Sequence, residues 1–187
     1  QCVCNVTHRG AVSADAKTGD GAGILTQIPH ALFATVLKQL KAEPVAAGDL
    51  GVGVLFLPQE ESQRASAQQL AEEQIRAGSL RLIGWREVPV DPSVLGDKAL
   101  NTLPVILHLL VGRPAAIAVE EFERRLFLVR RRIERAWEKA GIAQSYIPSF
   151  SSKTIVYKGL LVAPQLSLFY KDLSNPEYAS AIAVFHQ

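Results

Sequence analysis

The residues best suited to nucleophilic chemistry are two cysteines near the amino terminus, Cys2 and Cys4. A thiolate attacks a carbonyl carbon once a base has removed its proton, and a cysteine at a free amino terminus can use its own α-amine as that base. Cys2 is not the first residue, and neither cysteine has a base close to it in the sequence. We therefore interpret both as small apolar residues.

The histidines and the arginine-rich segment do not form a recognisable site. His8, His30, His108 and His186 lack the spacing of a zinc-ligand set, so we predict no metal site. The arginines between positions 124 and 135 have local partners in Glu120, Glu121, Glu123 and Glu134, which favours a solvated helix face over an anion site.

A glycine-rich stretch, Thr18–Gly23, could in principle cradle a phosphate with its backbone amides. That function needs a strand before the loop and a helix after it. Residues 14–17 contain no apolar strand, and the residues after Gly23 resemble a strand rather than a helix. We therefore predict a tight turn that lets two backbone segments approach closely.

Arg9 lies between His8 and Gly10, at the start of the segment that leads into the glycine-rich stretch. A guanidinium can bind a carboxylate through two parallel hydrogen bonds, so Arg9 is a candidate binding residue. An ordinary surface arginine would fit the same spacing, and from spacing alone that alternative is favoured.

Composition predicts one globular domain, or a large part of one. The chain has 187 residues, of which 48% are hydrophobic, and its net charge of +2 arises from 20 basic and 18 acidic residues. This balance gives no reason to expect nucleic acid or a membrane as a partner, and the chain has neither an 18-residue apolar run nor a signal-like start. Two cysteines two positions apart suit a disulfide poorly, so we expect a reducing cytoplasmic location.

Hydrophobic periodicity predicts alternating helices and strands. One apolar stripe, formed by Phe122, Leu126, Val129, Ile133 and Trp137, indicates a helix that packs on a core. The expected helices are 29–41, 60–77 and 119–140, and the expected strands are 24–28, 50–57, 80–90, 103–111, 145–150 and 179–186. We expect a loop over 91–102 and either a helix or a strand over 152–161. Strands 50–57 and 80–90 should be neighbours in a β-α-β unit, with helix 60–77 packed across them.

Several blocks, in order, resemble the glutaminase domain of glutamate synthase large subunits, and together they span almost the whole chain. The most specific is the string from His8 to Gly23; the others are 51–57, 84–89, 94–96, 124–127, 130–134, 151–160 and 181–187. The resemblance implies an α+β fold of the N-terminal-nucleophile hydrolase type, a four-layer αββα sandwich, here incomplete. It implies a supporting catalytic role for Arg9, beside the nucleophilic cysteine, and places Gly10, Asp20 and Gly21 in a structural loop near the active site.

The resemblance also implies that residues 1–187 are a single partial domain. In the family, an N-terminal cysteine followed by glycine lies before the segment that matches His8, and the remaining substrate-binding strands follow the segment that matches Gln187. We therefore expect the isolated chain to be inactive and both of its ends to be cuts. The parent enzyme would hydrolyse glutamine to glutamate and ammonia, and would use the ammonia for reductive amination of 2-oxoglutarate.

The implied cofactors, FMN and an iron–sulfur cluster, belong to other domains of the parent, and none is expected in this chain. The implied partners are glutamine, the remaining domains of the same large subunit and a small subunit, with electrons from a pyridine nucleotide or ferredoxin. An alternative from another class is a stand-alone, non-catalytic binding or scaffold module of the same fold. A nucleotide-binding enzyme that uses the glycine-rich stretch is the weakest reading.

Overall fold

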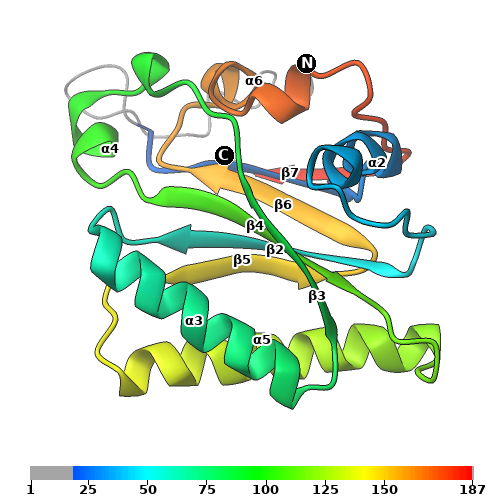
Figure 1. The fold of residues 1–187 in the computed structure, drawn as a ribbon. Coiled ribbons are helices and arrows are strands. Elements are labelled where there is room, and N and C mark those ends of the chain that lie inside the picture. Colours follow the sequence, from blue (N-terminus) through cyan, green and yellow to red (C-terminus); the bar gives the residue numbers. More distant parts are fainter. Residues whose placement is uncertain (1–18, 187) are drawn as a thin grey trace.

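The computed structural model describes residues 19–186 and arranges their strands in two antiparallel β-sheets (Figure 1). The three-stranded sheet has the order β6-β1-β7, formed by β1 (Ala22–Gln27), β6 (Thr154–Gly159) and β7 (Ala183–His186). The four-stranded sheet has the order β3-β4-β2-β5, formed by β2 (Leu50–Leu57), β3 (Arg81–Glu87), β4 (Val105–Gly112) and β5 (Tyr146–Ser151).

Helices of two kinds accompany the sheets. Three are longer: α2 (His30–Gln39), α3 (Glu61–Ala77) and α5 (Val119–Lys139). The others are short: α4 (Asp97–Asn101), α6 (Leu166–Phe169) and the 3-10 turns η2 (Pro92–Val94), η3 (Ala163–Gln165) and η4 (Lys171–Ser174). Within residues 19–186 no helix has both the length and the apolar composition that a bilayer span requires.

One hydrophobic core lies between the four-stranded sheet and the helix pair α3 and α5. All five residues of the predicted apolar stripe on α5 are buried in this core, so that prediction is confirmed. Helix α3 adds Ile75 together with Ala67 and Ala71, and the small side chains of the two alanines let the helices approach each other. The indole Nε1 of Trp137 donates a hydrogen bond of 2.9 Å to the carbonyl oxygen of Ala67, which joins α5 to α3.

A second core lies between the two sheets. Val54 and Leu110 face it from the four-stranded sheet, and Ile155 faces it from the three-stranded sheet. Phe33 of α2 and Phe169 of α6 complete it, so both helices flank the space between the sheets. The described residues therefore form an α+β arrangement in which α3 and α5, the four-stranded sheet and the three-stranded sheet are stacked in that order (Figure 1).

The predicted β-α-β neighbourhood of strands 50–57 and 80–90 is wrong, because β4 lies between β2 and β3. Burial explains this order. Seven of the eight residues of β4 are buried, as expected for a central strand, whereas β3 is exposed or half-buried along its whole length, as expected at an edge. Helix α3 does pack on this sheet, as predicted.

The other predicted elements agree with the structure apart from shifts at their ends, the largest of which is at the last strand, predicted over 179–186 and formed by residues 183–186. Residues 154–159, for which helix and strand were both open, form β6. The expected loop over 91–102 is wrong in part, since η2 and α4 interrupt it, and no prediction covered the short helices between Ala163 and Ser174. Helices of three to five residues are too short for an apolar period to reveal them.

A short turn at residues 152–153 connects the two sheets, because β5 and β6 are consecutive in the chain but belong to different sheets. The Glu123 carboxylate of α5 accepts three hydrogen bonds at this turn: one from Ser151 Oγ at 2.6 Å, and one each from the backbone N–H and Oγ of Ser152 at 2.7 Å. Helix α5 thus fixes the point at which the chain passes from one sheet to the other.

Candidate functional site

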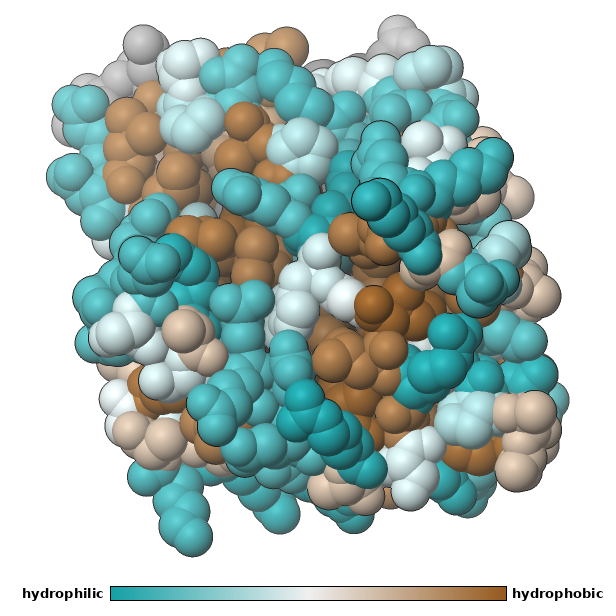
Figure 2. Space-filling model, in the orientation of Figure 1, coloured by the Kyte–Doolittle hydropathy of each residue, from teal (hydrophilic) through white to brown (hydrophobic). Residues whose placement is uncertain are grey.

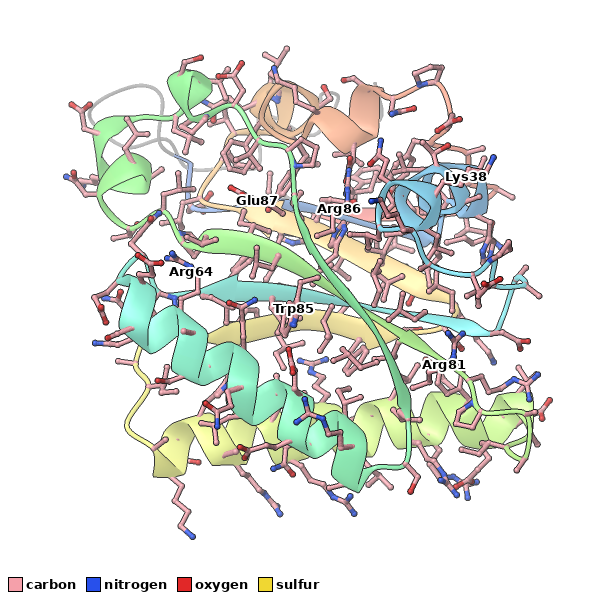
Figure 3. The ribbon with its side chains drawn as sticks, in the orientation of Figure 1. Lys38, Arg64, Arg81, Trp85, Arg86 and Glu87 are labelled. Atoms are coloured by element: carbon pink, nitrogen blue, oxygen red, sulfur yellow. The ribbon has the colours of Figure 1, made fainter. Side chains whose placement is uncertain are left out.

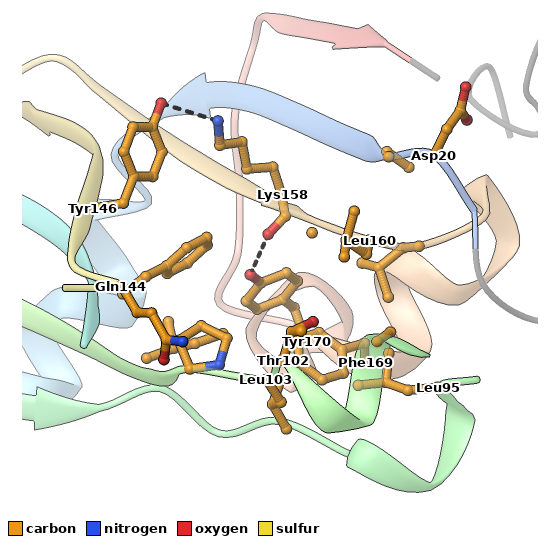
Figure 4. A pocket seen from close by; sticks show the side chains of 18 of the residues that line it. Asp20, Leu95, Thr102, Leu103, Gln144, Tyr146, Lys158, Leu160, Phe169 and Tyr170 are labelled. Atoms are coloured by element: carbon orange, nitrogen blue, oxygen red, sulfur yellow. Dashed lines mark hydrogen bonds between the residues drawn. The ribbon is translucent and has the colours of Figure 1, made fainter. Parts of the chain in front are cut away.

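A cavity of about 490 Å³ lies at one end of the space between the sheets, where β1 begins and β6 and β7 end (Figure 4). The antiparallel registers bring these ends together, since Ala22 pairs with Gly159 and Gly23 pairs with His186. The volume falls in the range of sites that hold small metabolites. We therefore treat this cavity as the candidate site.

The lining of the cavity is mainly apolar, with a few polar side chains. Its polar members include Asp20, Thr102, Gln144, Tyr146, Lys158 and His186. Its apolar members include Phe56, Leu95, Ala99, Leu103, Ile106, Leu160, Leu161 and Phe169. Figure 2 shows apolar surface at the upper left of the molecule, over the region of α4, which contributes to this lining. An apolar site with few polar groups orients a small polar ligand through those groups.

Close approach of neighbouring segments explains the glycines before and within β1. At Gly19 the neighbour is backbone, as predicted, since a Cβ there would lie 2.6 Å from the carbonyl carbon of Leu161. Gly21 has a φ of +142°, a conformation that residues with a side chain rarely adopt. A Cβ on Gly23 would lie 2.6 Å from His186 Nε2 and 2.9 Å from Lys158 Cβ. The segment continues as strand β1 rather than as a helix, so it lacks the strand–loop–helix geometry of a phosphate-binding loop.

Lys158 supplies a positive charge at the edge of the cavity. Its Nζ lies 3.0 Å from Tyr146 Oη, to which it donates a hydrogen bond, and 4.4 Å from the centre of the Tyr146 ring (Figure 4). Within residues 19–186 no carboxylate forms an ion pair with it. An ammonium group held by a phenol and without a counter-ion can attract an anionic ligand group.

One wall of the cavity consists of Lys158, Gly159, Phe169 and Tyr170, which we call the Lys158–Tyr170 wall. The phenol of Tyr170 donates a hydrogen bond of 2.7 Å to the backbone carbonyl of Lys158, so the segment after α6 is joined to the end of β6 (Figure 4). The Phe169 and Tyr170 rings pack edge to face at 4.8 Å. This wall is therefore assembled from two segments that are held together by a buried hydroxyl.

Behind this wall lies a buried polar cluster that sequence reasoning missed: Arg86, His108, Tyr157 and Asp172. Arg86 donates two parallel hydrogen bonds of 2.7 Å to the Asp172 carboxylate, and Tyr157 Oη donates a third of 2.8 Å. Arg86 Nη1 also lies 3.2 Å from His108 Nδ1. Figure 3 shows that Arg86 and its neighbour Trp85 point to opposite faces of β3, and Trp85 donates to Glu72 of α3. The signal in the sequence was a charged residue at an inward-facing position of a strand.

Burial and charge shift the pKa values of these groups in different directions. Burial would raise the pKa of Asp172, but the hydrogen bonds and charge of Arg86 outweigh it and leave that pKa below its usual value. Burial, and then the negative charge of Asp172, raise the pKa of Tyr157 well above its usual value. The cluster is therefore an ion pair with a neutral phenol at neutral pH.

His108 is neutral in the folded protein. Burial first, and repulsion from Arg86 second, lower its pKa from 6.5 to about 3. A guanidinium only donates, so Nδ1 accepts from Arg86 and the proton is on Nε2, which has no hydrogen-bond partner within residues 19–186. The imidazole packs against the rings of Phe33 and Tyr157.

We expect His108 to make the protein less stable as the pH falls from 7 to 5. In this range the unfolded chain binds a proton at His108 and the folded chain does not, so the free energy of unfolding decreases as the pH falls below 6.5. The expected loss is about 2 kcal/mol for this one group. Urea unfolding at pH 7 and pH 5 measures it, and His108→Leu should remove it. His30→Gln, a change at an exposed histidine, should leave the pH dependence in place. If the unchanged protein and both variants lost the same stability between pH 7 and pH 5, His108 would not be the group responsible.

The structure brings some of the predicted site residues together. Asp20 and Gly21 both line the cavity, and so does His186, for which no site role was predicted. Arg9 and Gly10 lie outside the described residues, as do His8 and both cysteines. His30 is exposed on α2, and residues 19–186 contain no group of three potential metal ligands. The described residues therefore form the cavity, and both cysteines of the chain precede them.

Comparison with known proteins adds independent information. The family profile described as "Glutamine amidotransferases class-II" matches residues 1–187. The chain is 45% identical over 181 residues to the ferredoxin-dependent glutamate synthase 2 of Synechocystis. The aligned segment is 96% of this chain and 11% of that protein. It is 39% identical over 183 residues to the large chain of the NADPH glutamate synthase of Azospirillum brasilense, which covers 97% of this chain and 12% of that protein. The chain thus spans about an eighth or less of the length of these relatives.

Proposed function

The chain belongs to the class-II glutamine amidotransferases, and on that basis we propose that it forms part of the glutaminase domain of a glutamate synthase large subunit. The family match over all 187 residues carries this proposal. The similarity to glutamate synthase large chains, at 35–45% identity across nearly the whole chain, supports the choice within the family.

The proposed reaction is the hydrolysis of the glutamine side-chain amide. A cysteine thiolate, supplied by the longer protein, attacks the carboxamide carbon; the C–N bond breaks, and ammonia leaves after it has gained a proton. Water then hydrolyses the glutamyl thioester and regenerates the thiol. In this proposal Arg9 orders the surroundings of the cysteine, while Gly10, Asp20 and Gly21 shape a wall of the site. The position of Asp20 and Gly21 on the cavity supports this role.

The full domain would have the four-layer αββα arrangement of N-terminal-nucleophile hydrolases. The antiparallel sheets, with helices over the four-stranded one, are consistent with it. On the outer face of the three-stranded sheet, Val184 is 61% exposed, and its partner Leu25 is only half-buried. Further elements of the longer protein would cover this apolar surface.

Cofactor chemistry would take place elsewhere in the parent enzyme. FMN and an iron–sulfur cluster are proposed for other domains, and the two cysteines of this chain cannot provide the thiolate set that usually holds such a cluster. Ammonia would pass within the protein to 2-oxoglutarate. The proposed partners are glutamine, the remaining domains of the large subunit and a small subunit, in a reducing compartment such as the cytoplasm.

The test is a glutaminase assay on two proteins. The full-length protein that contains this chain should release ammonia from glutamine, and with 2-oxoglutarate and an electron donor it should form glutamate. The 187-residue chain by itself should release none, because the resemblance places the nucleophilic cysteine before the segment that matches His8. A full-length protein without glutaminase activity would refute the proposal and would favour a non-catalytic module of the same fold.

A further inference from the structure

A single buried carboxylate joins the two sheets. Asp172 of η4 accepts two hydrogen bonds from Arg86, on the four-stranded sheet, and one from Tyr157, on the three-stranded sheet. The Asp172 side chain is 2% exposed and that of Arg86 is 14% exposed, so water screens this pair little. The carboxylate therefore sets the spacing between β3, β6 and the turn that carries it.

The cluster is continuous with the Lys158–Tyr170 wall of the cavity. Tyr157 directly precedes Lys158 in β6, and Asp172 follows Tyr170 by two residues. The rings of Tyr157 and Tyr170 pack edge to face at 4.8 Å, and Tyr170 bonds to the carbonyl of Lys158. A shift of Asp172 or Tyr157 would therefore be transmitted to both segments of the wall.

Stability alone does not account for such a cluster. Removing a carboxylate and a guanidinium from water costs much of what their attraction gains, so apolar residues of similar volume often stabilise a core equally well. A bidentate pair does fix geometry, because a guanidinium can donate two parallel hydrogen bonds to a carboxylate only over a narrow range of positions. The cluster is therefore suited to holding β3, β6 and η4 in one relative position.

We infer that Arg86, Tyr157 and Asp172 are positioning residues, which hold the Lys158–Tyr170 wall in the geometry that the substrate requires. The inference deepens the proposed function and rests on it for its kinetic consequence. None of the three residues lines the cavity, so they act through the wall and not by contact with substrate.

The experiment compares Tyr157→Phe and Asp172→Asn in the full-length protein with a matched control. Tyr157→Phe removes one hydroxyl and keeps the ring that packs on Tyr170. The control is Asp49→Asn, which weakens a second Arg–Asp pair. Arg113 Nε lies 2.7 Å from Asp49 Oδ1, and neither residue lines the cavity. Two quantities are measured: the KM for glutamine, and hydrogen–deuterium exchange of peptides that cover 158–161 and 169–170.

We expect both cluster variants to raise the KM for glutamine at least threefold and to speed exchange in those peptides at least tenfold. Asp49→Asn should change neither quantity by more than twofold, and activity with added ammonia should be unchanged in all variants. Unaltered exchange and KM in Tyr157→Phe would overturn the inference, even if Asp172→Asn failed to fold. Faster exchange of the wall in a protein without glutaminase activity would refute the proposed function but support the positioning role.

Discussion

Arg9→Lys in the full-length protein is expected to lower glutamine-dependent activity about tenfold or more. Lysine keeps the positive charge but loses the planar fork with which a guanidinium donates several hydrogen bonds in fixed directions. A tenfold decrease corresponds to about 1.4 kcal/mol of transition-state stabilisation. The measurement is kcat/KM for glutamine, beside the rate with added ammonia, which bypasses the glutaminase reaction.

The ammonia-dependent rate separates a catalytic role of Arg9 from a structural one. We expect that rate to remain nearly constant in Arg9→Lys. If both activities fell together, Arg9 would be a residue needed for folding, and if neither fell, it would be an ordinary surface arginine. Arg132→Lys, at an exposed position of α5, is the matched control and should leave both activities unchanged.

Trp137→Ala is expected to lower the free energy of unfolding by about 3–5 kcal/mol. The side chain is 2% exposed in the core beneath the four-stranded sheet, and its truncation would leave a cavity between α5 and α3. It would also remove the hydrogen bond from the indole to the carbonyl of Ala67. Urea unfolding of the chain, followed by far-ultraviolet circular dichroism, measures the change.

Two further variants show how much of the stability lost in Trp137→Ala comes from the hydrogen bond and how much from burial. Trp137→Phe keeps most of the buried ring and loses the hydrogen bond, so a loss of about 1–2 kcal/mol is expected. Phe127→Ala, on the same helix but 57% exposed, should change stability by no more than about 0.5 kcal/mol. Equal losses for Trp137→Ala and Phe127→Ala would contradict burial as the cause, because alanine has the higher helix propensity and neither loss could then come from the helix itself.

The local sequence pattern was sufficient to predict the helices and strands whose apolar pattern extends over many residues. The stripe of α5 recurs over about four turns, and each of its apolar residues is buried. The strand over 50–57 and the turn at Asp20 and Gly21 were predicted for similar reasons: a run of aliphatic residues, and glycines where backbones meet. The resemblance to glutaminase domains also depended on sequence alone, and the family match confirms it.

Strand pairing required the tertiary structure. The order of elements along the chain suggested that β2 and β3 are neighbours, but β4 pairs with both and separates them. A helical period is a property of adjacent residues, whereas pairing depends on which strands bury the most surface once all of them have met. The short helices α4 and α6 escaped prediction because they contain one turn or little more.

The buried cluster of Arg86, His108, Tyr157 and Asp172 shows most clearly which features follow from the sequence and which depend on the tertiary structure. The sequence by itself determined that Arg86 lies in a strand, that Tyr157 lies in a β-branched segment and that His108 lies in an apolar run. Only the fold places Arg86 within 2.7 Å of Asp172, a residue 86 positions away, and makes His108 neutral by burying it beside that arginine. The physical reason is that charge and burial act through space, so the chemistry of these groups depends on neighbours that no local pattern specifies.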